Sequence, residues 1–232
     1  MRVCAAAPFP TACAASCDPR WRPHDLLRLR RLDALDDEPA WLREAFERAP
    51  YAVVRRALAA EGFVAIGVRG AERAQRYGTW AHADEIVGVV SPESLAQARP
   101  DPGRDALPSF VALNSLQRDR SGPLSGFVWG PSGSTGFELA THVPAVSEAS
   151  DLDLLIRVPE PLAMNVAGAL LEQLQTLSAR LGVRIDAQLE TPAGGVALAE
   201  WAAGKARVLV RHASGPRLIA NPWADVAQDG AI

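Results

Sequence analysis

Two aspartates spaced two residues apart are the most chemically suggestive feature of this sequence. Asp151 and Asp153 lie in the string SDLDLLI, where they alternate with leucine and isoleucine. Alternate side chains of a β-strand share a face, so both carboxylates would project from one side, about 7 Å apart. Carboxylate oxygens at that spacing suit a hard divalent cation. The string therefore predicts a strand that binds a metal ion such as Mg²⁺.

A third carboxylate is expected from the string VRIDAQLE at residues 183–190. Its apolar and polar residues alternate, which places Asp186 and Glu190 on the polar face of a strand. If this strand lies beside the first, Asp186 joins the aspartate pair; Glu190 is the alternative if the register differs. Three carboxylates in one place repel one another and usually imply bound cations.

A glycine-rich turn supplies the complementary half of a reaction site. Gly133 and Ser134 precede TGFELA, a short predicted helix, so free backbone N–H groups and a hydroxyl could bind phosphate oxygens. Taken singly, a DxD string or a Gly-Ser pair is more often an ordinary solvated turn. Together and in this order they favour phosphoryl or nucleotidyl transfer with two Mg²⁺ ions, one activating the attacking hydroxyl and one neutralising pyrophosphate.

Several other catalytic motifs are incomplete in this sequence. Ser132 is followed two residues later by Ser134, where a nucleophile elbow requires glycine. Gly204 and Lys205 lack the remaining residues of a P-loop. The histidines at positions 24, 82, 142 and 212 form no cluster, which is typical of ordinary surface or core residues.

Composition restricts the classes of partner. The 232 residues include 24 basic and 27 acidic side chains, so the net charge is 24 − 27 = −3. Without a dense basic run, nucleic acid is not an expected partner. No window approaches 18 consecutive apolar residues, so a membrane-spanning segment is not expected either. The 48% hydrophobic content suffices for a packed core.

All three cysteines, Cys4, Cys13 and Cys17, lie near the start of the sequence. Two prolines interrupt this stretch, which argues against a secretory signal. A zinc site would need a fourth ligand, and the nearby His24 gives no standard spacing. We interpret residues 1–19 as an unstructured leader. The cysteine-free remainder fits a reducing cytoplasm, which is the expected location.

The elements that must position the candidate site alternate between strand and helix. In the first half, a helix is predicted between Asp37 and Pro50, with strands at 51–57, 63–68 and 85–90. In the second half the predicted order is strand 152–158, helix 161–181, strand 183–189, helix 196–203, and a hairpin of 206–212 with 217–220.

A stretch with three prolines and a glycine, residues 98–108, is the best candidate for a linker. The sequence therefore predicts an α+β protein of two small mixed α/β domains. The first would cover residues 20–97 and the second, carrying the candidate site, residues 109–232.

The glycine-rich turn, the paired aspartates and the later aspartate strand together resemble the nucleotidyltransferase superfamily of the DNA polymerase β type. The resemblance implies a fold of that type for the second domain. Sixteen residues separate Ser134 from Asp151, which is longer than is usual in that superfamily.

A closer resemblance is carried by RPHDLL, GVRGAERAQR, WGPSGSTGFELAT, SDLDLLI and QLETPAGGVALAEWA. These strings are similar to the phosphoribosyl-dephospho-CoA transferase family of malonate decarboxylase, from about Arg22 to Trp223. The resemblance implies transfer of a 2'-(5''-phosphoribosyl)-3'-dephospho-CoA group from its triphosphate precursor to a serine of the apo acyl carrier subunit, with release of pyrophosphate. It also implies that Asp151 and Asp153 are catalytic.

Three arginines in GVRGAERAQR, at positions 69, 73 and 76, are candidates to bind the phosphates of the precursor. A plain solvated helix face is the alternative interpretation of Arg69, Arg73 and Arg76. Other functions remain open: a carrier-protein transferase of the citrate lyase type, a nucleotidyltransferase that uses an NTP, or a non-catalytic module that binds carrier proteins.

Overall fold

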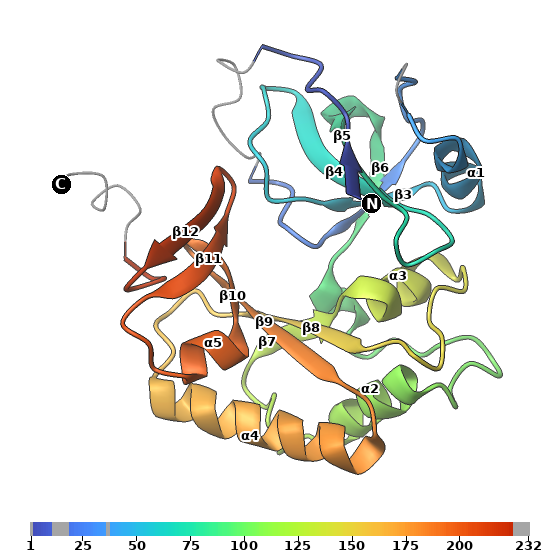
Figure 1. Ribbon diagram of the computed structural model, residues 1–232. Helices are drawn as coiled ribbons and strands as arrows, with labels where there is room; N and C mark the ends of the chain where they lie inside the picture. Colours follow the sequence, from blue (N-terminus) through green and yellow to red (C-terminus); the bar gives the residue numbers. More distant parts are fainter. Residues whose placement is uncertain (1, 11–18, 36–37, 225–232) are drawn as a thin grey trace. The chain divides into compact units, whose positions relative to one another are not determined.

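The computed structural model describes residues 2–10, 19–35 and 38–224, and the chain divides into two compact units, Met1–Ser91 and Pro92–Ile232. Each unit contains one six-stranded sheet with helices packed against it (Figure 1). The prediction of a mixed α/β protein is confirmed. None of the helices in the described ranges is long and apolar enough to cross a membrane.

The sheet of the first unit has the strand order β1-β5-β4-β3-β2-β6. β1 pairs in parallel with β5, and the other neighbours are antiparallel. The elements are β1 (Arg2–Cys4), β2 (Leu26–Leu29), α1 (Trp41–Arg48), β3 (Tyr51–Val54), β4 (Phe63–Arg69), β5 (Arg76–His82), the 3₁₀ turn η2 (Ala83–Glu85) and β6 (Ile86–Val90).

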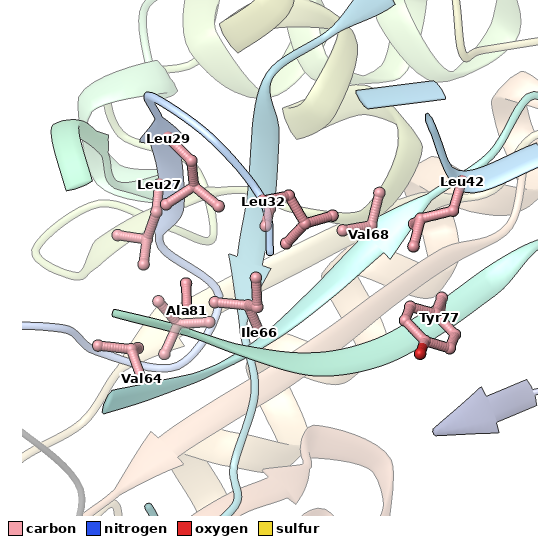
Figure 2. Packing of buried hydrophobic residues seen from close by; sticks show 11 residues of the cluster. Leu27, Leu29, Leu32, Leu42, Val64, Ile66, Val68, Tyr77 and Ala81 are labelled. Carbon is pink, nitrogen blue, oxygen red and sulfur yellow. The ribbon is translucent and has the colours of Figure 1, made fainter. Parts of the chain in front are cut away.

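The core of the first unit forms where α1 meets this sheet. Leu42 of α1 is 1% exposed and belongs to the same cluster as Leu27, Ile66 and Tyr77, which come from three strands (Figure 2). Removal of these side chains from water is the main favourable contribution to folding of the unit.

The sheet of the second unit has the order β12-β11-β10-β9-β8-β7, in which β8 and β9 are parallel and the other pairs antiparallel. Its strands are β7 (Val128–Pro131), β8 (Leu152–Arg157), β9 (Ile185–Thr191), β10 (Gly194–Ala197), β11 (Val208–His212) and β12 (Gly215–Ile219). Its helical elements are η3 (Pro92–Leu95), α2 (Pro108–Arg118), α3 (Gly133–Thr141), α4 (Met164–Leu181) and α5 (Leu198–Ala202).

Helices cover the two faces of the second sheet unequally. In Figure 1, α2, α4 and α5 lie on one side of the sheet and α3 on the other. α4 packs its apolar stripe of Ala167, Leu170, Leu174 and Leu177, a spacing of three and four residues that matches the helical period. Gly182, at φ 66°, ends α4 in the left-handed conformation, as the sequence predicts.

Part of the predicted leader is structured. Arg2–Cys4 form β1 and pair with Arg76, Tyr77 and Gly78, so the prediction of an unstructured segment is wrong for these residues. The backbone supplies this pairing, because a short extended segment can complete the edge of a sheet without any side-chain pattern. Cys13 and Cys17 lie outside the described residues.

The predicted domain boundary is also displaced. The two units separate after Ser91, so residues 98–108 belong to the second unit and are not a linker. Gln117 Nε2 donates a hydrogen bond to the Ala98 carbonyl at 3.0 Å, and Arg104 forms an ion pair with Glu138 at 2.7 Å. Side-chain contacts of this kind anchor a proline-rich segment whose composition alone suggests a linker.

The structure differs from the sequence prediction at two further strands. The segment after Gly70 leads into β5, and the predicted helix at 196–203 is shared between the end of β10 and the short α5. In both places small residues such as glycine and alanine carry no clear periodicity, so pairing with a neighbouring strand decides the conformation.

Candidate functional site

The glycine-rich turn and the aspartate strand lie directly against each other. β7 and β8 are antiparallel, with Pro131 opposite Leu154, so the turn that follows β7 meets the start of β8. The Ser132 N–H donates a hydrogen bond to the Asp153 carbonyl at 2.8 Å. The structure therefore joins the two halves of the predicted site, which are about twenty residues apart in the sequence.

Gly133 is required at this junction for two reasons. Its φ of +59° lies in the left-handed region that side chains disfavour, and a Cβ placed there would be 2.0 Å from Asp153 Oδ2. The carboxylate of Asp153 thus packs against the backbone at the first residue of α3. Ser134 follows within the first turn, whose N–H groups have no intrahelical acceptors.

Asp186 lies on the strand beside this pair. In the parallel pairing of β8 and β9, Asp153 is the partner of Asp186, so their side chains share a face of the sheet. Glu190 is instead the partner of Arg157, four residues further along. The register therefore favours Asp186 over Glu190 as the neighbour of the aspartate pair.

The carboxylate of Asp186 is held by the arginine that directly precedes its strand. Arg184 Nε lies 2.9 Å from Asp186 Oδ1, and Arg184 Nη2 lies 2.8 Å from Oδ2. The hydrogen bond that Arg184 donates to Asp186, and then the charges of Asp186, Asp151 and Asp153, raise the pKa of Arg184. Sequence reasoning missed this arginine, although its position two residues before Asp186 on one strand face was a usable signal.

The three aspartates are not gathered into one ligand set. Among residues 2–10, 19–35 and 38–224, no three histidine, cysteine or acidic side chains are placed to hold a metal ion. Asp153 lies in β8 and Asp151 directly precedes it, and both are partly exposed. Two such carboxylates are the kind of ligand that Mg²⁺ commonly takes from a protein, with substrate phosphates and water completing its shell. The pairing with Arg184 separates Asp186 from that set.

The three candidate arginines belong to the first unit. Arg69 ends β4 and Arg76 begins β5, and the two are direct partners across this hairpin. Arg73 lies exposed in the connecting turn, and its carbonyl accepts a hydrogen bond from Arg76 Nε at 3.4 Å. They are therefore grouped at one end of a hairpin, and the alternative of a solvated helix face is wrong.

Glu138 of α3 is a buried acid that sequence reasoning missed. It is 5% exposed and accepts hydrogen bonds from Arg104 Nε at 2.7 Å, from Arg104 Nη2 at 2.9 Å, and from the N–H groups of Ala145 and Val146, both at 2.7 Å. Burial alone would raise the pKa of Glu138, but these hydrogen bonds outweigh it and lower the pKa below its usual value.

This pair fixes the segment that separates the turn from the aspartates. Residues 142–151 connect α3 to β8, and the bonds to Ala145 and Val146 tie their middle to Glu138. Arg104 adds a bond to the Val146 carbonyl at 2.8 Å. The sequence contained a signal for this ion pair, namely a glutamate inside the apolar string GFELA. A glutamate in such a string is expected to be buried, and buried acids are normally paired.

Both units match models of a single protein family. The model described as the phosphoribosyl-dephospho-CoA transferase MdcG C-terminal domain matches residues 94–222, and the MdcG N-terminal domain model matches residues 22–92. The break between these matches, at residue 93, lies within two residues of the boundary after Ser91 in the structure. No solved structure matches this chain.

Curated proteins extend the match over most of the chain. A phosphoribosyl-dephospho-CoA transferase from Azotobacter vinelandii is 44% identical over 207 residues, which cover 89% of this chain and 96% of the relative. Transferases of the same name from Pseudomonas putida strain GB-1 and Klebsiella pneumoniae are each 42% identical, covering 88% and 87% of this chain and 95% and 96% of the relatives.

The family models and these relatives identify the chain as an enzyme of the transferase class. The chain belongs to the phosphoribosyl-dephospho-CoA transferase family, which confirms the resemblance drawn from its motifs.

Proposed function

We propose that this enzyme transfers the 2'-(5''-phosphoribosyl)-3'-dephospho-CoA group from 2'-(5''-triphosphoribosyl)-3'-dephospho-CoA to a serine of the apo acyl carrier subunit of malonate decarboxylase. One observation carries the proposal: the carboxylate of Asp153 lies against the backbone of Gly133, at the first turn of α3. An acid beside the first-turn N–H groups of a helix is an arrangement suited to transfer between a phosphate and a hydroxyl.

In the proposed step the serine Oγ attacks the phosphorus nearest the ribose. The new O–P bond forms as the bond from that phosphorus to the bridging oxygen of pyrophosphate breaks. Mg²⁺, held by Asp151 and Asp153, would supply positive charge to the phosphate oxygens and the leaving group. The serine proton passes to a carboxylate of the site or to water, and the backbone of Gly133 and Ser134 orients the phosphates.

Asp186 is proposed as the third acid. Arg184 now neutralises it, and an arginine is equally suited to bind phosphate oxygens. Exchange of Arg184 from Asp186 to a bound phosphate would release the carboxylate toward the aspartate pair. Arg69, Arg73 and Arg76 are proposed to bind other phosphates of the precursor.

The finer structural and cellular assignments also belong to this proposal. The order of turn, aspartate strand and third acidic strand supports a nucleotidyltransferase fold of the polymerase β type in the second unit. The absence of cysteine after residue 17 supports action in the cytoplasm.

The test uses the full-length protein with Mg²⁺, the triphosphate precursor and the apo carrier subunit of malonate decarboxylase. We expect pyrophosphate release and a matching increase in the mass of the carrier. A reaction with the carrier subunit of citrate lyase alone, or with an ordinary NTP alone, would assign the enzyme to one of those substrates. No transfer to any of these acceptors would leave a carrier-binding module without chemistry.

A further inference from the structure

The β11–β12 hairpin and the residues that flank it carry a concentration of positive charge. Residues 203–222 include Lys205, Arg207, Arg211 and Arg217 and no aspartate or glutamate, although the whole chain has a net charge of −3. Lys205 and all three arginines are exposed. Removing these four charges from the total of 24 leaves 20 − 27 = −7 for the rest of the chain, so the hairpin is a local basic surface on an acidic protein.

Two leucines lie exposed within this basic surface. Leu209 is 41% exposed and Leu218 is 61% exposed, and the two are direct partners across the hairpin. Their neighbours on β11, Val208 and Val210, are 0% and 1% exposed and point to the opposite face. One face of the hairpin therefore packs into the unit while the other presents an apolar pair with cations around it.

The exposed face of the hairpin is continuous with the face that carries the candidate site. Paired residues of neighbouring strands, and alternate residues of one strand, project from the same side of a sheet. On β9, Asp186 and Glu190 therefore share a face, and Asp186 is the partner of Asp153 on β8. Glu190 is in turn the partner of Gly195 on β10, which is the partner of Arg211 on β11. The hydrogen bond from Arg211 Nη1 to Gln188 Oε1 crosses from β11 to β9 on this side. The aspartates and the leucine pair thus lie along one face of one sheet.

We propose that the outer face of the β11–β12 hairpin, centred on Leu209 and Leu218 and bordered by Arg207 and Arg211, binds an acidic surface of the acyl carrier protein that receives the prosthetic group. The proposal rests on the proposed function, because it identifies the docking surface for the second substrate of that reaction. A polar, charged border around an apolar centre is the organisation of protein interfaces. The basic border would attract an acidic partner and orient it for encounter.

A protein fits this surface better than the nucleotide precursor does. Two exposed leucines offer no hydrogen bond to phosphate, ribose or adenine, and they are well suited to the apolar centre of a protein contact. Glu200, which precedes the basic segment, accepts a hydrogen bond from the Leu209 N–H at 2.7 Å. This contact holds the hairpin against α5.

The test compares Arg207→Glu and Leu218→Ser with Arg180→Glu, a charge reversal on α4, which covers the opposite side of the sheet. For the first two variants we expect the KM for the apo carrier subunit to rise about tenfold, with kcat and the KM for the triphosphate precursor nearly unchanged. Added salt should weaken carrier binding to the wild type more than to Arg207→Glu. Arg180→Glu should behave as the wild type does.

The proposed docking surface would be overturned if the KM for the carrier stayed unchanged in Arg207→Glu and Leu218→Ser, or if it rose equally in Arg180→Glu. A rise confined to the KM for the precursor would also overturn it, because that result would assign the hairpin to the nucleotide. Calorimetric titration of the apo carrier subunit separates this result from failure of the proposed function. If the wild type transfers nothing, binding that is lost in Arg207→Glu and kept in Arg180→Glu would still establish the surface. If Arg207→Glu and Arg180→Glu bind the carrier equally well, or if the wild type does not bind it, the proposed docking surface is refuted.

Discussion

Two pairs of arginine and carboxylate in the second unit use the same ionic chemistry in opposite surroundings. The side chains of Glu138 and Arg104 are 6% and 29% exposed, whereas those of Asp186 and Arg184 are 43% and 70% exposed. Burial makes the first pair costly to break, because either partner alone would leave an unpaired charge away from water. Water screens the second pair, so its partners can be exchanged at little cost.

The comparison separates the parts of the site that hold position from the parts that can react. Glu138 fixes α3 and the segment leading to Asp151, and so acts on the aspartates only through the backbone. Asp153 and Asp186 are partners on one face of the sheet, and both are partly exposed to solvent. Substitutions in the first group should change stability, and substitutions in the second should change activity.

The largest effect is expected for Asp153→Asn. The substitution keeps the shape of the side chain and removes its charge, so transfer should fall on the order of 100- to 1000-fold. The melting temperature should stay close to that of the wild type, since this carboxylate is only partly buried. Steady-state pyrophosphate release and differential scanning calorimetry would measure both quantities. Asp105→Asn, at an exposed position of the same unit, is the control; equal activity in the two variants would contradict a catalytic role for Asp153.

Glu138→Gln should give the largest loss of stability. It leaves Arg104 without its charged partner, and we expect the free energy of unfolding to fall by about 3 kcal/mol. Urea denaturation would measure this change. The control is Glu148→Gln, which replaces an exposed acid in the same segment.

The pH dependence follows from the lowered pKa of Glu138. Its contribution to stability is complete above the unfolded pKa, near 4.5, and is lost as the pH falls through the lower folded pKa. Stability of the wild type should therefore decline more steeply than that of Glu138→Gln below about pH 4.5. Parallel curves for the two proteins would show that the pair is not a stability determinant.

Gly133→Ala should reduce activity more than stability. The left-handed φ costs an alanine about 1–2 kcal/mol, and the new Cβ must displace the carboxylate of Asp153. We expect transfer to fall about tenfold or more. Gly168→Ala on α4, where a Cβ meets nothing within 4 Å, is the matched control. Full activity in Gly133→Ala would mean that the contact between the turn and Asp153 does not matter for transfer.

The smallest effect is expected for Arg184→Ala. Without this arginine, the Asp186 carboxylate loses its partner and becomes available to a cation, so affinity for Mn²⁺ should rise modestly while the melting temperature hardly changes. Titration of Mn²⁺ followed by electron paramagnetic resonance would measure the affinity. If Arg184→Ala and Arg184→Lys bind Mn²⁺ as the wild type does, Asp186 takes no part in metal binding.

Strong periodicity made several elements predictable from the sequence. Alternation of apolar and polar residues located β8 and β9, and the three- and four-residue spacing of leucines together with Gly182 located α4. Weak periodicity explains why β10 and β5 were not predicted. Both strands contain small residues whose conformation depends on a neighbouring strand.

The sequence by itself determined the chemical groups and their order: a glycine-rich turn, paired aspartates and a third acid. These follow from residue types and local spacing, which are properties of the chain. Tertiary structure alone decided that Asp186 is the neighbour of Asp153, that Arg184 holds it, and that Arg104 ties the proline-rich segment to Glu138. Strand register and the burial of an ion pair depend on residues distant in the chain, so no local pattern could establish them.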